Sequence, residues 1–404
     1  MDPHRSIARS AERVLSLPRA ADPVPDDAVQ EHSGHGRSAH DRAVHDRSGQ
    51  DRAAHDRSGL DRSGLDRSEH DPNEGAAYDR WPSVRSQVVS TAIRLGVRPF
   101  VHRVPGHARG IRTARSTVDA ASLLLRPSQR VRVRQVIDPQ VESGRLRRSV
   151  RGEWVVTRDA EEADPAGAVL YLHGGGYVVC SPRTHRPITS RLALETGLPV
   201  FAPRYRLAPE HCFPAPLEDA LAAYRWLLDR GIPAAGIVIA GDSAGGHLAA
   251  ALTGEICRTG LPRPAGTVLF SPWVDLTCEL SIQAQQRARD PYISARSARR
   301  VARLVVGPAG FDDPRLALLT CPWTDTPPFL IQVGGAEVLR PEAEELAREL
   351  NEAGTACELQ VWNGQMHVFQ ILNRVLPEAD AAMRETGRFI RSVIAPGAAD
   401  TEAA

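Results

Sequence analysis

The fold is decided by one stretch of the chain, Ile237-Val-Ile-Ala-Gly-Asp-Ser-Ala-Gly-Gly-His247. Four residues that suit a buried strand lead into a turn, and the turn leads into Leu248-Ala-Ala-Ala-Leu252, which predicts a helix. Ser243 lies on this corner with one glycine two residues before it and another two residues after it. Glycine and serine also fill ordinary turns. The strand and helix on either side nevertheless favour a nucleophile elbow, in which neighbouring elements pass too close for a Cβ atom.

Length and composition restrict the class of protein. The 404 residues suffice for one large α/β domain with additions or for two modest domains. The chain has 50 Lys and Arg against 49 Asp and Glu, so its charge does not indicate a nucleic-acid partner. Its 6 cysteines have no metal-ligand spacing and are typical of a reducing compartment. No signal peptide or membrane span is evident, so we expect a cytoplasmic protein without stable membrane insertion.

The first part of the chain, residues 1–80, is predicted to be a disordered tail. Residues 35–71 repeat a five-residue unit built on His-Asp-Arg-Ser-Gly and contain almost no apolar side chain to bury. The histidines of the repeat could bind a metal, but their acidic and basic neighbours favour a solvated, low-complexity segment. Residues 397–404 are predicted to fray.

Residues 81–148 are predicted to form a helical cap region. Within it, residues 83–95 and 116–125 carry apolar side chains at helical spacing, with Ser83 and Ser116 as candidate N-caps. Helices of this length are marginal alone, so we expect them to lie over a larger domain. That catalytic domain is predicted to cover residues 149–396, beginning with a strand at 149–157.

From residue 167 onward, short apolar runs alternate with helical periods, which predicts an α/β fold with a mainly parallel sheet and helices on both faces. The predicted strands cover residues 168–173, 199–202, 237–240, 266–270, 329–333 and 358–362. The predicted helices cover residues 185–196, 215–229, 246–258, 294–306, 341–353 and 377–393, of which 294–306 is placed to carry a covering segment.

A glycine-rich loop, His173-Gly-Gly-Gly-Tyr177, directly follows a predicted strand. Consecutive glycines leave backbone N–H groups open to a close approach by a ligand. In an acyl-transfer enzyme, the N–H groups of Gly174, Gly175 and Gly176, together with that of Ala244, would hold the oxyanion of a tetrahedral intermediate. A flexible turn is the alternative, but the loop and the elbow occur in the expected order and each follows a strand.

A serine nucleophile needs a base, and the base needs a carboxylate that orients it. Beyond His247, which belongs to the helix of the elbow, the chain has a single histidine, His367, just after a predicted strand. Glu337 is the carboxylate nearest to the end of strand 329–333, where loops carry the sites of such sheets. It could instead face the positive end of the helix that follows. The remaining candidates for the acid are Glu342, Glu344 and Asp275, whereas Asp242 is interpreted as a structural residue that holds neighbouring loops.

Several motifs together resemble the hormone-sensitive-lipase family of α/β-hydrolases over about residues 84–393. They are the glycine loop, the block Tyr205-Arg-Leu-Ala-Pro-Glu-His-Cys-Phe-Pro-Ala-Pro216, Gly-Asp-Ser-Ala-Gly-Gly, Ser271-Pro-Trp-Val-Asp275 and Met-His-Val-Phe. The resemblance implies the α/β-hydrolase fold with an N-terminal helical cap, a triad of Ser243, Glu337 and His367, and an oxyanion hole from the glycine loop and Ala244. Many relatives carry Asp where this chain has Glu337, and the repeat tail has no counterpart in the family.

Bacterial members of this family are carboxylesterases and lipases, so the resemblance implies a carboxylic ester hydrolase that works through an acyl-enzyme. A capped pocket implies short or medium acyl chains. The mechanism needs no metal and no cofactor, and its expected partner is a small-molecule ester. Hydrolysis of lactones or amides on the same machinery and a binding module without turnover are the alternatives, and a homodimer is left open.

Overall fold

One eight-stranded sheet runs through the residues that the structure describes, which are 77–99, 108–124, 127–142, 145–159, 166–285 and 290–394 of a computed structural model. The order of the strands is β1-β2-β4-β3-β5-β6-β7-β8. The strands from β3 to β8 are parallel to one another, whereas β1 and β2 pair antiparallel with each other and β2 pairs antiparallel with β4. The strand bounds are β1 (Val131–Glu142), β2 (Arg145–Thr157), β3 (Ala168–Leu172), β4 (Val200–Pro203), β5 (Ile237–Asp242), β6 (Gly266–Phe270), β7 (Phe329–Gly334) and β8 (Cys357–Trp362).

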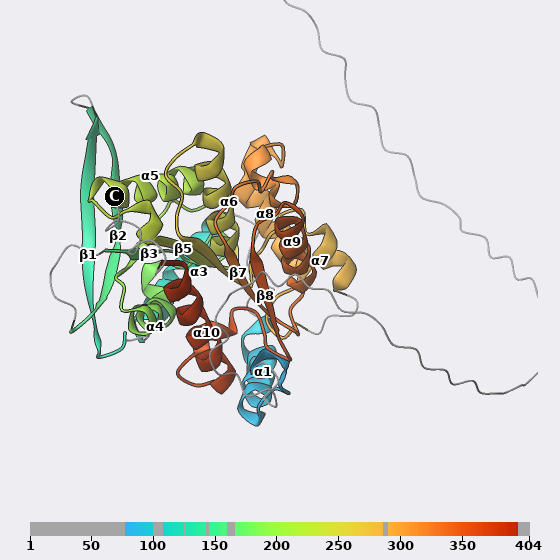
Figure 1. Cartoon of the computed structure of the whole chain (residues 1–404). Coiled ribbons are helices and arrows are strands. Elements are labelled where there is room, and N and C mark those ends of the chain that lie inside the picture. The colour runs from blue at the N-terminus through green and yellow to red at the C-terminus, as the bar shows by residue number, and fades with distance from the viewer. Residues whose placement is uncertain are drawn as a thin grey trace, which may run out of the picture. The chain divides into compact units, whose positions relative to one another are not determined.

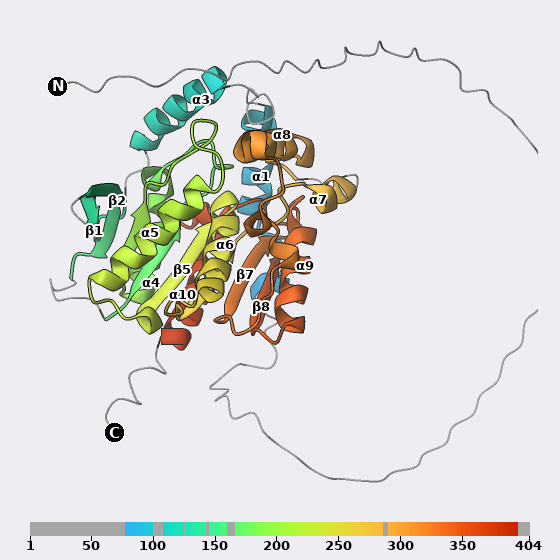
Figure 2. The ribbon, with the colours of Figure 1, turned by 90° about the horizontal axis from the view of Figure 1, so that it is seen from above.

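Helices cover both faces of the sheet, so the predicted fold class is confirmed (Figures 1 and 2). On one face lie α5 (Ala215–Asp229), α6 (Ala244–Thr259) and α9 (Arg340–Glu352), and on the other lie α4 (Arg186–Thr196) and α10 (Pro377–Ile394). Alternate side chains of a strand point to opposite faces. In β5, Ile237 and Ile239 therefore join the core under α6, whereas Val238 and Ala240 join the core under α4. Burial on both faces explains why the parallel strands read as continuous apolar runs.

The covering elements are α1 (Val84–Gly96), α3 (Ala108–Ala121), α7 (Glu279–Ala284) and α8 (Ala295–Val306). The predicted cap of α1 is confirmed, because the Ser83 side chain accepts a hydrogen bond from the N–H group of Ser86 at 3.2 Å. The predicted cap at Ser116 is wrong, since α3 begins at Ala108 and Ser116 lies inside it. Short 3-10 helices complete the described chain: η1 (Ala77–Asp79), η2 (Ser122–Leu124), η3 (Pro182–His185), η4 (Ala234–Gly236), η5 (Gly307–Ala309), η6 (Pro314–Leu316), η7 (Leu318–Thr320) and η8 (Phe369–Leu372).

The end of the predicted helical region, 81–148, is a strand instead. Residues Val131–Glu142 form β1, which pairs with β2 in a long hairpin at the edge of the sheet. The physical reason is the alternation Val131-Arg-Val-Arg134, whose period of two residues places valine on one face and arginine on the other. The predicted tail, 1–80, and frayed end, 397–404, fall almost entirely outside the described residues, although η1 lies within the last part of that tail.

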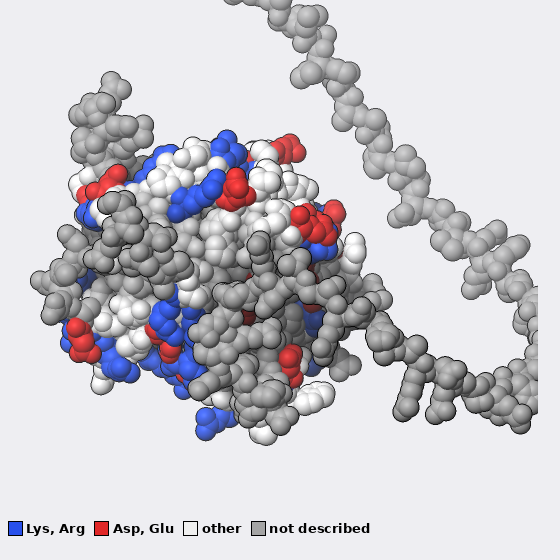
Figure 3. Space-filling view, in the orientation of Figure 1, with Lys and Arg blue, Asp and Glu red and all other residues white. Residues whose placement is uncertain are grey.

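Charges of both signs lie interspersed over the visible face of the molecule (Figure 3). Several charged side chains of the described chain form ion pairs within one helix, such as Arg348 with Glu345 and Glu352 in α9. Among the described residues, no helix has both the length and the apolar character needed to cross a membrane.

Candidate functional site

Ser243 lies on the corner between β5 and α6 with a backbone conformation that few residues adopt, φ 53° and ψ −121°. The glycines around it are needed for space. A Cβ atom at Gly241 would lie 2.2 Å from the carbonyl oxygen of Gly245, and one at Gly245 would lie 2.1 Å from that of Leu172. The corner is held by a hydrogen bond from the Ser243 N–H group to the carbonyl of Phe270, at 2.9 Å. A side chain held in this strained turn is a frequent mark of a functional site.

His367 follows β8 and lies between the serine and a carboxylate. Its Nε2 atom is 2.9 Å from Oγ of Ser243, and its Nδ1 atom is 2.8 Å from Oε2 of Glu337. A carboxylate can only accept, so Nδ1 carries the proton toward Glu337, and Nε2 is left to accept the proton of the serine hydroxyl. The structure thus brings together the three residues that the sequence singled out for the triad.

Glu337 is fixed by contacts to both of its carboxylate oxygens. While Oε2 faces His367, Oε1 accepts hydrogen bonds from the Ser271 hydroxyl at 2.6 Å and from the Gly334 N–H group at 2.5 Å. The Ser271 hydroxyl in turn accepts from the N–H group of Val368 at 3.0 Å. Ser271 therefore joins the loop that carries the acid to the loop that carries the histidine.

The other carboxylates considered for this role point elsewhere. Glu342 accepts hydrogen bonds from the Asp275 N–H group, at 3.0 Å, and from the Ser281 hydroxyl. Asp275 accepts from Thr277 and from the N–H group of Glu279, and Glu344 pairs with Arg340. None of these three carboxylates has a hydrogen bond to His367 among the described residues.

The environment of His367 decides its protonation. Burial lowers the pKa of the imidazole, but the hydrogen bond and charge of Glu337, with smaller contributions from Asp290 and Asp242, outweigh burial and raise the pKa above its ordinary value. A raised pKa suits a base that must hold the proton of the serine while the tetrahedral intermediate forms.

Asp290 and Tyr292 belong to this site but were not found from the sequence. Asp290 is buried, which raises its pKa, and its Oδ2 atom accepts from the N–H group of Val338, beside Glu337. The ring of Tyr292 stacks against that of His367 with 6.0 Å between centroids. An Asp-Pro-Tyr sequence indicates only a turn, so nothing in the spacing placed these residues near the histidine.

The glycine loop adopts conformations that only glycine takes readily. Gly175 and Gly176 have φ values of 112° and 60°, and their N–H groups have no hydrogen-bond acceptor within the described chain. The N–H group of Gly174, in contrast, donates to Oδ1 of Asp242 at 2.9 Å. The expectation that Gly174 offers its N–H group to an oxyanion is therefore corrected: that group already has a buried partner. Ala244 lies buried at the first position of α6, where N–H groups have no partner within the helix.

Asp242 fastens the start of the glycine loop to the elbow. Besides Gly174, the hydroxyl of Tyr171 donates to Oδ1 at 2.6 Å, and Nε2 of His185 lies 3.1 Å from Oδ2. Burial alone would raise the pKa of Asp242, but the charge and hydrogen bond of His185, with those from Tyr171 and Gly174, lower it below the usual value. Asp242 is therefore an ionised structural residue, in agreement with the interpretation from the sequence.

A second polar bridge fastens the end of the same loop. The hydroxyl of Tyr177 is 2.7 Å from Nδ1 of His247, and Nε2 of His247 is 3.2 Å from the carbonyl oxygen of Leu316. Because a carbonyl only accepts, Nε2 carries the proton and Nδ1 accepts from Tyr177. Burial lowers the pKa of His247 to about 4, so the ring is neutral near pH 7.

Two covering helices lie over the glycine loop, α3 and α8, at the same edge of the molecule (Figure 2). Arg115 of α3 donates to the carbonyl oxygens of Val178, at 3.0 Å, and Ala208, at 2.9 Å. Val301 of α8 is so close that a Cβ atom at Gly176 would lie 3.2 Å from its Cγ1 atom. The space above the glycine loop is therefore bounded by both helices.

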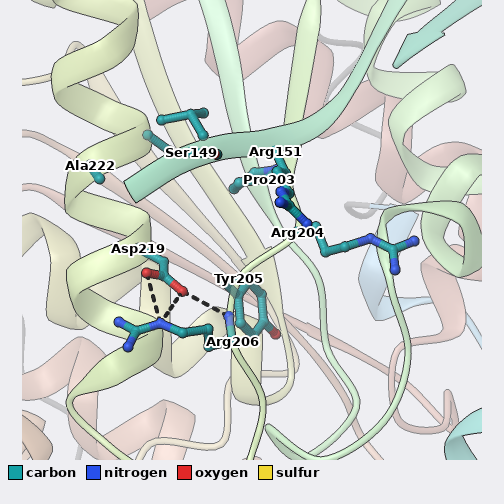
Figure 4. A pocket seen from close by; sticks show the side chains of 10 residues that line it. Ser149, Arg151, Pro203, Arg204, Tyr205, Arg206, Asp219 and Ala222 are labelled. Carbon is teal, nitrogen blue, oxygen red and sulfur yellow. Dashed lines mark hydrogen bonds and ion pairs between the residues drawn. The ribbon is translucent and has the colours of Figure 1, made fainter. Parts of the chain in front are cut away.

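One surface hollow lies away from the triad. A cavity of about 410 Å³ is bounded by β2, β4 and α5, and its residues include Ser149, Arg151, Arg204 and Arg206 (Figure 4). Arg206 is held there by Asp219 at 2.8 and 3.0 Å. A smaller one, of about 290 Å³, lies between α3 and the glycine loop, and neither includes Ser243.

Comparison with known proteins places these features in context. A family model described as alpha/beta hydrolase fold matches residues 169–371. An acetyl-hydrolase of Streptomyces hygroscopicus is 40% identical over 61% of this chain and 81% of its own. The carboxylesterase/phospholipase LipF of Mycobacterium tuberculosis is 35% identical over 78% of this chain and 83% of its own. The crystal structure of an esterase from the bacterial hormone-sensitive lipase family, 32% identical, superposes with a TM-score of 0.68 over 78% of this chain and 100% of that one.

Proposed function

The chain belongs to the hormone-sensitive-lipase-like branch of the α/β-hydrolases and is a serine carboxylic ester hydrolase; from this premise we propose that Ser243, His367 and Glu337 are its nucleophile, base and acid. The observation that carries the proposal is the continuous chain of hydrogen bonds from Oγ of Ser243 through His367 to Glu337, at 2.9 and 2.8 Å. Each member is held by the element that carries it, so the geometry is in place before an ester binds.

In the proposed reaction, Nε2 of His367 takes the proton of the Ser243 hydroxyl while Oγ attacks the ester carbonyl carbon. The carbonyl oxygen becomes an oxyanion, which accepts hydrogen bonds from the N–H groups of Gly175, Gly176 and Ala244. The imidazolium then donates its proton to the alcohol oxygen as the C–O bond breaks, which leaves an acyl-enzyme. Water, deprotonated by His367 in the same way, attacks the acyl carbon and releases the acid with Ser243 restored.

Replacing the nucleophile tests this assignment. We expect Ser243→Ala to lower kcat for p-nitrophenyl butyrate by about 10⁶-fold, because no other hydroxyl of the described residues has a hydrogen bond to His367, and to leave the melting temperature nearly unchanged. The matched control is Ser392→Ala, on the exposed surface of α10, which should keep full activity. Hydrolysis by the Ser243 variant at more than about one-thousandth of the normal rate would contradict the assignment.

We further propose that the substrates are esters of short or medium acyl chains. Two observations support this: α3 and α8 bound the space above the glycine loop, and one relative is named an acetyl-hydrolase. A series of p-nitrophenyl esters of increasing acyl length should show kcat/KM at its maximum among the shorter acyl groups. The same purified enzyme tested on lactones and anilides separates ester hydrolysis from the two alternatives on the same machinery.

A cytoplasmic location and the assembly state are also matters for proposal. The six cysteines are all free, which supports a reducing compartment; fractionation of the producing cells tests it. A homodimer would need a surface to share, and β8 is a sheet edge that pairs only with β7 within the described chain. Light scattering of the purified chain decides between monomer and dimer.

A further inference from the structure

Helix α1 displays a narrow apolar stripe to solvent. Trp81 is 93% exposed, Val84 76%, Val88 61% and Leu95 74%. At 3.6 residues per turn, positions 84, 88 and 95 fall on one face of the helix, and Trp81 lies three residues before the helix begins. Single exposed apolar residues are common, but three on one face of a helix, with only Thr91 between Val88 and Leu95, indicate an interaction surface. We call this set the outer stripe.

The opposite face of the same helix is firmly attached to the enzyme (Figure 1). Val89 and Ile93 pack against a cluster that includes Trp362 and Phe369. The Ser86 hydroxyl donates to Oε1 of Gln365 at 2.9 Å. The helix is thus already stabilised through its inner face, and the outer stripe is a second apolar face that its folding does not use.

The charges on α1 are of one sign. The helix contains Arg85 and Arg94 and no acidic residue, and both arginines are exposed. Neither has an acidic partner among the described residues. A helix surface that combines tryptophan and aliphatic side chains with arginine is typical of helices that lie in the interface of an anionic membrane.

We propose that the outer stripe of α1 docks the enzyme on an anionic lipid surface. The apolar side chains enter the boundary between headgroups and acyl chains, while Arg85 and Arg94 contact the anionic headgroups. A second copy of the chain fits this face less well. In a two-fold dimer through this face, Arg85 and Arg94 of one copy would lie near the same arginines of the other. These like charges would repel each other, because neither α1 helix carries a carboxylate to pair with them.

Docking at this face bears directly on the position of the active site. Gln365, which accepts the hydrogen bond from α1, precedes His367 by two residues on the same loop. An enzyme docked through α1 therefore holds the histidine loop about one helix diameter, roughly 10 Å, from the lipid surface where esters of low solubility collect. The inference goes beyond hydrolysis itself, because activity on a soluble ester does not require it.

The experiment is sedimentation of the full chain with vesicles of phosphatidylcholine alone or mixed with phosphatidylglycerol. We expect binding to the mixed vesicles, lowered at least about tenfold in the triple variant Val84→Gln, Val88→Gln, Leu95→Gln. Replacing Arg85 and Arg94 by Gln should lower binding to vesicles that contain phosphatidylglycerol by about fivefold for each arginine, and should not change binding to vesicles of phosphatidylcholine alone. The matched control is Ile137→Gln, which removes an equally exposed apolar side chain on β1.

Hydrolysis of p-nitrophenyl butyrate separates this test from the proposed catalytic mechanism, since all these variants should keep it. Absence of binding by the unaltered chain, or equal binding by the triple variant, would overturn the proposal. So would a dimer that the triple variant dissociates, because the stripe would then bind a second copy. The emission of Trp81 is obtained by subtracting the fluorescence spectrum of the Trp81→Phe variant from that of the unaltered chain. If this emission is that of a buried indole in the absence of vesicles, the chain itself covers the outer stripe, and the proposal is overturned.

Discussion

The role of the acid can be tested by replacing Glu337 with glutamine, which keeps the shape of the side chain and removes its charge. One terminal atom must face Ser271 and Gly334, both of which donate, and only the amide oxygen can accept from them. The amide NH₂ group then faces Nδ1 of His367, 2.8 Å away in the native site. Two donors cannot share one hydrogen bond, so Nδ1 must become the acceptor.

This change places the imidazole proton on the wrong nitrogen. With Nδ1 accepting from the amide, Nε2 carries the proton and can no longer take the one from Ser243. In serine proteases the equivalent substitution of the acid lowers kcat by about 10⁴-fold, and we expect a loss of about 10³- to 10⁴-fold here. The pH profile should also shift. In the native enzyme the raised pKa of His367 means that kcat/KM falls with decreasing pH around a midpoint above 6.5. Without the charge of Glu337, burial lowers that pKa, and the midpoint moves to lower pH.

The assay is kcat/KM for p-nitrophenyl butyrate between about pH 5 and 9, with the melting temperature as a check on folding. Glu344→Gln makes the same chemical change on α9, at a partly exposed residue that pairs with Arg340, and should change neither rate nor profile. Loss of less than about tenfold in the Glu337 variant, with an unmoved acid limb, would refute the assignment of Glu337 as the orienting acid.

Two buried side chains near the site give further predictions. Tyr177→Phe removes the donor to Nδ1 of His247 and should lower kcat by about tenfold with little change in KM, because the bridge aims the N–H groups of the glycine loop; an unchanged kcat would leave the bridge a purely structural role. Burial raises the pKa of Glu342 to about 8. The contribution of protonated Glu342 to the free energy of unfolding is therefore fully present below about pH 4.5 and is lost as the pH rises through about 8. Relative to a Glu342→Gln variant at the same pH, the free energy of unfolding of the native chain in urea should therefore fall by roughly 3–5 kcal/mol over that interval, because the other titrating groups are common to both chains.

Much of the site could be predicted from the sequence, because the chemistry of acyl transfer restricts the choice. Only one histidine follows the elbow helix, and only a few carboxylates follow strand ends in the required order. The parallel strands were equally evident from the sequence, because a strand that is buried on both faces consists of an uninterrupted run of mostly apolar residues. Ser243 and His367 follow from such local signals, each of which stands in a single stretch of chain.

What the sequence did not reveal depends on contacts between distant segments. The N–H group of Gly174 cannot be distinguished from those of Gly175 and Gly176 until Asp242 is seen to accept from it. Asp290 likewise reaches the acid loop across 48 positions of sequence. The strand β1 was missed for a different reason. Its alternation of apolar and polar residues with a period of two is local to the sequence, but the many arginines made the segment look like part of a polar helical region.

The elbow at 237–247 does more than expose a nucleophile. Its residue before the serine, Asp242, holds one end of the glycine loop, and its His247 holds the other end through Tyr177. A displacement of β5 and α6 therefore moves the serine oxygen and the N–H groups of the glycine loop in the same direction. The distance between attacking atom and N–H groups, on which stabilisation of the intermediate depends, is in this way fixed within one strand–turn–helix unit rather than across the domain. His367 and Glu337 instead follow β8 and β7 of the same sheet, and substitutions elsewhere in the fold can disturb their approach to Ser243.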